Sequence, residues 1–141
     1  GQRYGSDDFV TGGIPVVLNM GGFGGQRMMA PRAVETDVPA LYDYWREGDN
    51  FSYAIPVGNG RWTVTLYTFE PRKVLTEPVT MRVRANGKGA LAPFDVAAEA
   101  GGAMRGLRKQ FDVRVTNGVL KLDFSGDGGR AVVAAIAIAP R

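Results

Sequence analysis

Apolar and polar side chains alternate along much of the chain after residue 50, and this alternation predicts β-strands. In the stretch FSYAIPVGNGRWTVTLYTFE (residues 51–70), every second residue is large and apolar on both sides of a glycine turn. A period of two is what a half-buried antiparallel strand requires. The Asn59-Gly60 pair between the two runs tolerates the positive φ angles of a short loop. The stretch is therefore predicted to be a β-hairpin.

The same pattern recurs twice further along the chain. Residues 79–88, VTMRVRANGK, alternate and end in an Asn-Gly turn. Residues 108–124, RKQFDVRVTNGVLKLDF, place alternating runs on both sides of Asn117-Gly118. This second stretch is predicted to be another hairpin.

Three shorter segments complete the predicted strand set. Residues 91–102 indicate a short strand and a glycine-rich bend, and residues 15–18 form a short apolar run that predicts one buried strand. Residues 130–140, RAVVAAIAIAP, predict a closing strand of small side chains that is buried on both faces. With about eight strands and no convincing helix, we expect an all-β fold, a jelly-roll β-sandwich of two antiparallel sheets. Residues 1–141 are expected to form this single domain.

Composition and charge exclude several classes of partner. The 45% hydrophobic and 22% charged fractions are typical of a globular domain, and the net charge is +3. Lys and Arg are scattered among Asp and Glu without a basic run, so no nucleic-acid or membrane partner is expected. No stretch approaches the ~20 apolar residues of a membrane span. The first 20 residues lack a signal-peptide layout, so secretion would depend on residues outside this sequence.

The usual catalytic residues are missing from the sequence. There is no histidine and no cysteine, which removes the commonest general base, metal ligand and thiol nucleophile. Adjacent Asp7 and Asp8 would point to opposite sides of a strand, so they could not flank one glycosidic bond. The other acidic side chains considered are expected to be solvated turn carboxylates, namely Glu70, Asp95, Glu99 and Asp127. The domain itself is therefore not expected to be an enzyme.

No cofactor is predicted from the glycine-rich loops. GGFGG (residues 21–25) lacks the lysine and the following Ser or Thr of a phosphate-binding loop. A calcium ion in SGDGG (residues 125–129) is conceivable because hard cations prefer oxygen ligands, but a single aspartate does not support it.

Aromatic and polar residues are concentrated in the segment before the first predicted hairpin. Residues 28–45 are predicted to form a long ordered loop. The aromatic and polar stretch YDYWREGDN (residues 42–50) overlaps the end of this loop. A sugar presents an apolar C–H face and a polar rim, so a protein binds it with flat rings and fixed polar groups. Tyr44, Trp45 and Arg46 are candidates for this role, and packing in the core is an equally weighted alternative.

The ordered set of motifs resembles the malectin-like carbohydrate-binding domains appended to bacterial glycoside hydrolases. The hairpin stretch is similar to that family's Y-x-I-P, glycine turn and L-x-F-x-E series, with Leu66-Tyr67-Thr68-Phe69-Glu70 shifted by one residue. The resemblance extends through MRVRANGK, PFDVAAEAGG, FDVRVTNGVLKLDF and AVVAAIAIAP in the family's order, and to YGSDDFVTGG and LYDYWREGDNFSY before them.

The resemblance implies a jelly-roll sandwich that binds glucose-type or related oligosaccharides through loop aromatics and an aspartate. Carried over by position, the carbohydrate-binding residues are Tyr44, Trp45, Arg46 and Asp127. Their partners would be an oligosaccharide or polysaccharide and the catalytic domain of a larger enzyme, which is secreted or periplasmic. Two departures stand out. PRKVLTEP (residues 71–78) lacks the family's aromatics, and VVLNMGG follows Asp7-Asp8, so the first strand lies outside this chain or the order differs.

Three functions follow from these observations. The leading one is a lectin-like, non-catalytic carbohydrate-binding module of a secreted carbohydrate-active enzyme, in which the loop of residues 42–49 recognises the sugar. The second is a structural sandwich that packs between domains of a glycoside hydrolase and binds no sugar. The third, a small glycan-cleaving enzyme, would need two carboxylates or a Tyr/Arg pair converging in a cleft.

Overall fold

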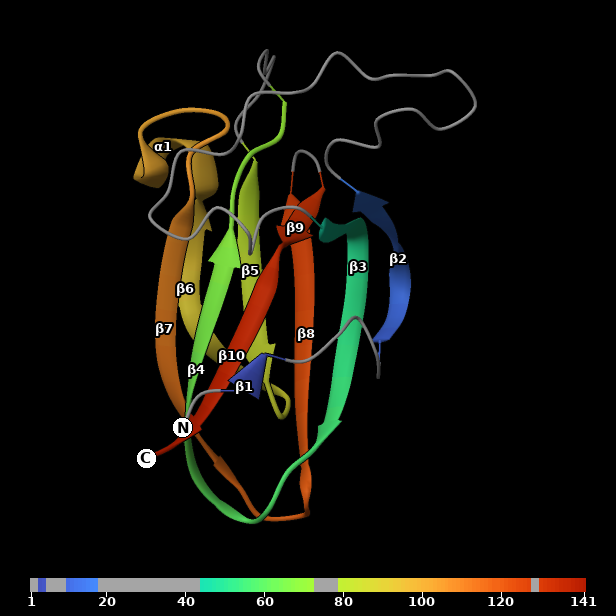
Figure 1. The fold of residues 1–141 in the computed structure, drawn as a ribbon, viewed down its shortest axis with the longest axis vertical. Coiled ribbons are helices and arrows are strands. Elements are labelled where there is room, and N and C mark those ends of the chain that lie inside the picture. The colour runs from blue at the N-terminus through green and yellow to red at the C-terminus, as the bar shows by residue number, and fades with distance from the viewer. Residues whose placement is uncertain (1–2, 5–9, 18–43, 73–78, 128–129) are drawn as a thin grey trace.

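Two antiparallel β-sheets pack face to face in the computed structural model, which describes residues 3–4, 10–17, 44–72, 79–127 and 130–141 (Figure 1). The four-stranded sheet has the order β1 (Arg3–Tyr4), β10 (Ala135–Pro140), β4 (Gly60–Thr68) and β7 (Leu107–Val115). The six-stranded sheet has the order β2 (Val10–Val17), β3 (Tyr44–Pro56), β8 (Val119–Asp127), β5 (Thr80–Ala85) and β6 (Lys88–Asp95), and β9 (Ala131–Val133) also pairs with β3. The predicted all-β sandwich is confirmed.

The two stretches predicted as hairpins form their strands but do not pair as hairpins. β3 lies in the six-stranded sheet and β4 in the four-stranded sheet, so residues 57–59 arch from one sheet to the other. β7 and β8 are likewise divided between the sheets by residues 116–118. The ladders instead join β4 to β7 and β3 to β8. The two hairpin predictions were therefore wrong in their pairing.

Backbone angles explain why one Asn-Gly pair makes a hairpin and the other two do not. A two-residue type I′ hairpin turn needs positive φ at both central residues. Asn86 has φ 49° and Gly87 has φ 83°, and the flanking Ala85 and Lys88 are paired. The pairs at 59–60 and 117–118 have positive φ only at the glycine, so each turn directs its strands into different sheets.

The main core fills the space between the two sheets. Its largest fully buried side chains include Leu66 and Val64 of β4, Met81 and Val83 of β5, and Leu120, Leu122 and Phe124 of β8. Phe51 and Phe124 lie opposite each other in the β3–β8 ladder, with ring centroids 5.4 Å apart. Alternating residues from the two predicted hairpins thus supply both walls of the core.

The C-terminal segment also differs from its prediction. It forms two strands rather than one, because β9 pairs with β3 and β10 pairs with β4. Ala134 lies between them, and its N–H donates to the carbonyl of Tyr67 at 2.8 Å. The Thr68 hydroxyl donates to the carbonyl of Val132 at 2.5 Å. The segment thus crosses from one sheet to the other, and side chains such as Ala135 and Ile136 remain half-buried.

A short helix replaces part of the predicted glycine-rich bend. α1 (Val96–Ala100) begins after Asp95, whose carboxylate accepts from the Ala98 N–H at 3.0 Å as an N-cap. It ends at Gly101, whose φ of 88° places it in the left-handed region that glycine favours. The helix has five residues, and no helix in the described ranges is long and apolar enough to cross a membrane.

We expect Leu122→Ala to lower the free energy of unfolding by about 2–5 kcal/mol, because it leaves a cavity in the main core. Leu122 is fully buried, whereas its exposed neighbour Lys121 offers a control on the same strand. Lys121→Ala should cost less than about 0.5 kcal/mol. Urea unfolding measures both variants, and equal losses would contradict this assignment of the core.

Candidate functional site

The predicted binding residues all lie at one end of the sandwich. Because β3 and β8 are antiparallel, the start of β3 and the end of β8 meet at the end that also carries β9 (Figure 1). We call this the β9 end. The opposite end, which carries the turns at residues 57–59, 86–87 and 116–118, we call the turn end.

The segment predicted as a recognition loop is a strand in its described part. Residues 44–49 belong to β3, where β2 pairs on one side and β9 on the other. Arg46, for example, lies opposite both Pro15 and Val133. Pairing on both sides satisfies the backbone of a polar stretch that lacks a hydrophobic alternation of its own. Residues 42 and 43 lie outside the described residues.

This strand conformation separates Trp45 from Arg46. Successive side chains of a strand point to opposite faces, so Trp45 shares a face with Glu47 and Arg46 does not. The half-buried Trp45 ring packs edge-on against Phe69, with centroids 5.0 Å apart and an interplanar angle of 88°. Its Nε1 donates to Glu47 Oε1 at 3.1 Å. Arg46 instead donates from Nη1 to the carbonyl of Gly12 at 2.8 Å.

Four charged residues interact with one another near this indole and form what we call the ionic cluster: Glu47, Glu70, Arg72 and Arg130. Glu70 follows β4 and is only 2% exposed. Arg72 donates to both of its carboxylate oxygens, from Nε at 2.7 Å and Nη2 at 3.0 Å, and also from its backbone N–H at 2.9 Å. Glu47 accepts from Arg130 Nη1 through Oε2 at 3.3 Å. The cluster therefore links the end of β4 to the start of β3 and to the residue before β9.

The electrostatics of the cluster favour its charged form. The hydrogen bonds from Arg72 to Glu70 raise the pKa of the Arg72 guanidinium, partial burial opposes this, and the charges of Glu70 and Glu47 add to the increase. A cation whose pKa is raised on folding contributes stability that is fully present below its unfolded pKa and is lost as the pH rises through the folded pKa. The guanidinium therefore stays charged throughout the neutral range and keeps the buried Glu70 carboxylate paired.

Tyr44 and Asp127 lie at the β9 end but apart from the ionic cluster. Tyr44 is the first residue of β3, and its backbone pairs with Val17. Asp127 ends β8 opposite Thr80, and its carboxylate accepts from Arg82 Nε at 2.7 Å. The side chains of Asp127 and Arg82 are both more than half exposed, at 58% and 52%. No described contact joins Asp127 to Trp45 or Arg46.

Sequence reasoning missed the ionic cluster. Glu70 was expected to be a solvated turn carboxylate, and this prediction was wrong because Arg72 and the chain around it exclude water from it. The available signal was the position of Glu70 directly after the buried Phe69 and two residues before an arginine. Its burial depends on tertiary contacts that the local sequence does not specify. Within the described ranges, no three acidic side chains approach one another as a metal site.

The sequence profile of the malectin domain matches residues 1–138. The chain belongs to the malectin family. No curated protein matches this malectin domain in sequence. Solved structures do match, including Bacteroides uniformis beta-glucuronidase 2 covalently bound to cyclophellitol-6-carboxylate aziridine, with 15% identity and a TM-score of 0.68 over 98% of this chain.

Plant receptor-like kinases share the fold as well. The FER structure in complex with the peptide RALF23 and with LLG2 has 16% identity and a TM-score of 0.70 over 94% of this chain. The ANX2 ectodomain from Arabidopsis thaliana has 13% identity and a TM-score of 0.68 over 96%. This malectin domain spans 14% of the glucuronidase chain, 40% of the FER chain and 41% of the ANX2 chain. At these identities the likeness concerns the fold.

We expect Arg72→Gln to lower the free energy of unfolding by about 2 kcal/mol, because it leaves the buried Glu70 carboxylate without its guanidinium. Arg82→Gln is the matched control at the same end of this malectin domain. Its partner Asp127 is exposed, so the loss should stay below about 1 kcal/mol. Guanidinium chloride unfolding distinguishes them, and a control loss as large as that of Arg72→Gln would contradict the cluster's structural role.

Proposed function

We propose that this malectin domain is a non-catalytic carbohydrate-binding module whose binding surface is the β9 end. One observation carries the proposal: the indole of Trp45 lies in one bonded group with Glu47 and Arg130, next to the Arg72–Glu70 pair. An aromatic ring, guanidinium donors and a carboxylate acceptor thus lie together, on β3 and on the residues that flank β4 and β9. These are the groups that sugar recognition requires.

The exposed parts of the cluster suit hydroxyl groups. The side chains of Arg72 and Arg130 are 40% and 50% exposed, so each guanidinium keeps N–H groups directed to solvent. A guanidinium has five donors, and the bonds to Glu70 and Glu47 fix its plane while leaving donors for a ligand. Such contacts are individually weak, so the expected affinity is micromolar to millimolar, on the order of 4–8 kcal/mol.

The hydrogen bonds of the two carboxylates support a binding role over a hydrolytic one. Both oxygens of Glu70 accept from Arg72, and the two oxygens of Glu47 accept from Trp45 and Arg130. A glycosidase needs one carboxyl group that donates a proton and another that attacks or activates water. Carboxylates that accept from guanidinium and indole donors hold those donor groups in position instead.

Tyr44, Arg46 and Asp127 complete the proposed site as flanking contacts. They belong to the same end of the six-stranded sheet as Trp45, which supports including them in the proposed surface. Asp127 and Arg82 offer a second exposed carboxylate–guanidinium pair. A ligand longer than one sugar unit would reach both the cluster and this rim.

We further propose that the module is extracellular and attached to a glycoside hydrolase. The region of similar fold covers 14% of the Bacteroides uniformis beta-glucuronidase 2 chain, which supports a role as one part of a larger enzyme. An attached module raises the local concentration of its partner domain at the polysaccharide. The second candidate, an interdomain packing module, is favoured by the half-buried state of Trp45 against Phe69.

Titration of the domain with maltotetraose, cellotetraose and laminaritetraose tests the proposal. The chain has two tryptophans, so a Trp62→Phe background leaves Trp45 as the reporter. We expect a saturable fluorescence change with at least one of these sugars. By calorimetry, Trp45→Ala and Arg130→Gln should each weaken binding about tenfold or more, because each removes a direct contact.

Trp62→Phe is the control for binding, since Trp62 lies at the turn end and donates from Nε1 to the carbonyl of Gly58. Its affinity should equal that of the unmodified domain. Binding that persists in both Trp45→Ala and Arg130→Gln would place the sugar elsewhere. A folded domain with no response to these sugars would favour the packing module.

A further inference from the structure

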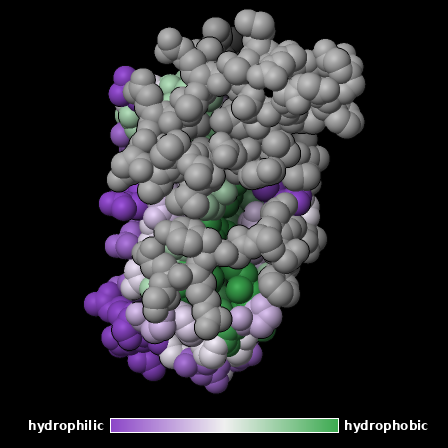
Figure 2. All heavy atoms as spheres, in the orientation of Figure 1, coloured by the Kyte–Doolittle hydropathy of each residue, from purple (hydrophilic) through white to green (hydrophobic). Residues whose placement is uncertain are grey.

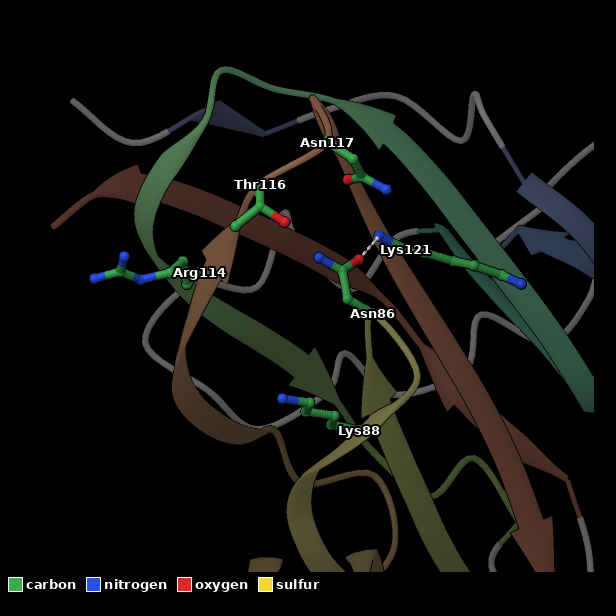
Figure 3. Close-up of a pocket in the computed structure, with 6 residues that line it drawn as sticks. All are labelled: Asn86, Lys88, Arg114, Thr116, Asn117 and Lys121. Carbon is green, nitrogen blue, oxygen red and sulfur yellow. Dashed lines mark hydrogen bonds between the residues drawn. The ribbon is translucent and has the colours of Figure 1, made fainter.

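A hollow of about 430 Å³ opens at the turn end, far from the ionic cluster (Figure 3). It lies between the β5–β6 turn and the arch that joins β7 to β8. Its lining residues are Asn86, Lys88, Arg114, Thr116, Asn117 and Lys121. Three of these six side chains are cationic and none is acidic, so the hollow is lined chiefly by hydrogen-bond donors.

The cations of this hollow have no acidic partner in the part of the chain that the structure describes. Lys88, Arg114 and Lys121 are exposed, and none has a carboxylate within 4.0 Å among the described residues. Arg114 also lies directly opposite Arg61 in the β4–β7 ladder. Like charges placed opposite each other in a ladder destabilise it unless an anion lies between them. The turn end thus carries positive charge that no carboxylate among the described residues neutralises.

Two carboxylates that lie close in sequence to these cations are already occupied. Asp112, two residues before Arg114, pairs with Arg141 and accepts from the Thr63 hydroxyl at 2.8 Å. Asp123, two residues after Lys121, accepts from the Ser52 hydroxyl at 2.5 Å. Figure 2 shows hydrophilic residues gathered over the turn-end parts of β4 and β7.

The positions of the cations indicate a ligand with several spaced charges. Figure 3 shows Lys88 reaching into the space between the two turns, while Arg114 and Lys121 extend to opposite sides. A single small anion would be held best by cations that converge on one point. Cations that point apart instead match a polymer that carries charges at intervals.

The polar residues of the hollow match sugar hydroxyls. The side-chain oxygen Oδ1 of Asn86 accepts from the backbone N–H of Lys121 at 2.8 Å. This bond fixes the side-chain amide and leaves its NH₂ group for a ligand. Asn117 is held in the same way by the Val119 N–H at 3.3 Å. The Thr116 hydroxyl adds a group that both donates and accepts. The lining contains no aromatic ring on which a nucleobase could stack, which disfavours single-stranded nucleic acid.

We propose that the turn end binds an acidic polysaccharide, a glycan chain that carries carboxylate or sulfate groups. The site is separate from the proposed neutral-sugar surface at the β9 end and does not depend on it. No basic run in the sequence indicates this site, because Arg61, Lys88, Arg114 and Lys121 come from four different strands. The arches and the β5–β6 hairpin bring them together.

Three dextrans test the proposal, since they share one backbone and differ in charge: neutral dextran, carboxymethyl dextran and dextran sulfate. Affinity electrophoresis or calorimetry at low salt should show binding of the two charged polymers and none of neutral dextran. We expect Lys88→Gln/Arg114→Gln to weaken this binding about tenfold or more, because two charged contacts are lost. The matched control, Arg105→Gln/Arg108→Gln, removes the same charge from exposed positions at the other end of β7 and should change binding less than twofold.

Two further experiments distinguish an acidic polysaccharide from free sulfate and from nucleic acid. Free sodium sulfate, at the same sulfate concentration as the polymer, should compete weakly, and duplex DNA should bind at least tenfold more weakly than dextran sulfate. Equal losses in the two double variants would overturn the proposal, because binding would then follow net charge alone. Equal binding of DNA, or full competition by free sulfate, would also overturn it. Calorimetry with the neutral tetraoses should be unaffected by Lys88→Gln/Arg114→Gln, so the two proposed sites can fail independently.

Discussion

Two tight arches that carry the chain from one sheet to the other determine the rest of this structure. They are tied together at the turn end, where the Val57 N–H donates to the carbonyl of Gly118 at 3.0 Å and the Gly118 N–H donates to Asn59 Oδ1 at 2.7 Å. Because each arch divides its strands between the sheets, β3 pairs with β8 and β4 pairs with β7. The apolar faces of the arched strands then meet across the core, which places the same strong alternation on both walls.

At the β9 end, the chain crosses from the six-stranded sheet to the four-stranded sheet between β9 and β10. The bonds from Ala134 to Tyr67 and from Thr68 to Val132 hold the seam between the two sheets. The ionic cluster lies beside this seam, where Glu70 is buried and Arg72 and Arg130 reach solvent. One end of the sandwich therefore presents paired charges beside an indole, and the other presents cations beside amides that no described carboxylate neutralises.

The sequence was sufficient for most strands after residue 50 but not for their partners. Alternation around Phe51 and Val113 located β3 and β7, because period two arises from the strand itself. Pairing could not be deduced, since an arch and a hairpin share that alternation and an Asn-Gly turn. The strand at Arg46 was missed because neighbours on both sides, rather than local propensity, hold it extended. The burial of Glu70 and the gathering of cations around Lys88 also depend on contacts between segments distant in sequence.

The central claim is that neutral sugar binds at the β9 end, and backbone amide chemical shifts of the unmodified ¹⁵N-labelled domain test it most directly. On addition of the bound tetraose, the largest shifts should fall on residues 45–48, 69–72 and 130–133, which surround the ionic cluster. The amides of residues 86–88 and 114–121 at the turn end should stay unchanged. Shifts confined to the turn end, or to the outer face of the six-stranded sheet away from Trp45, would contradict the account.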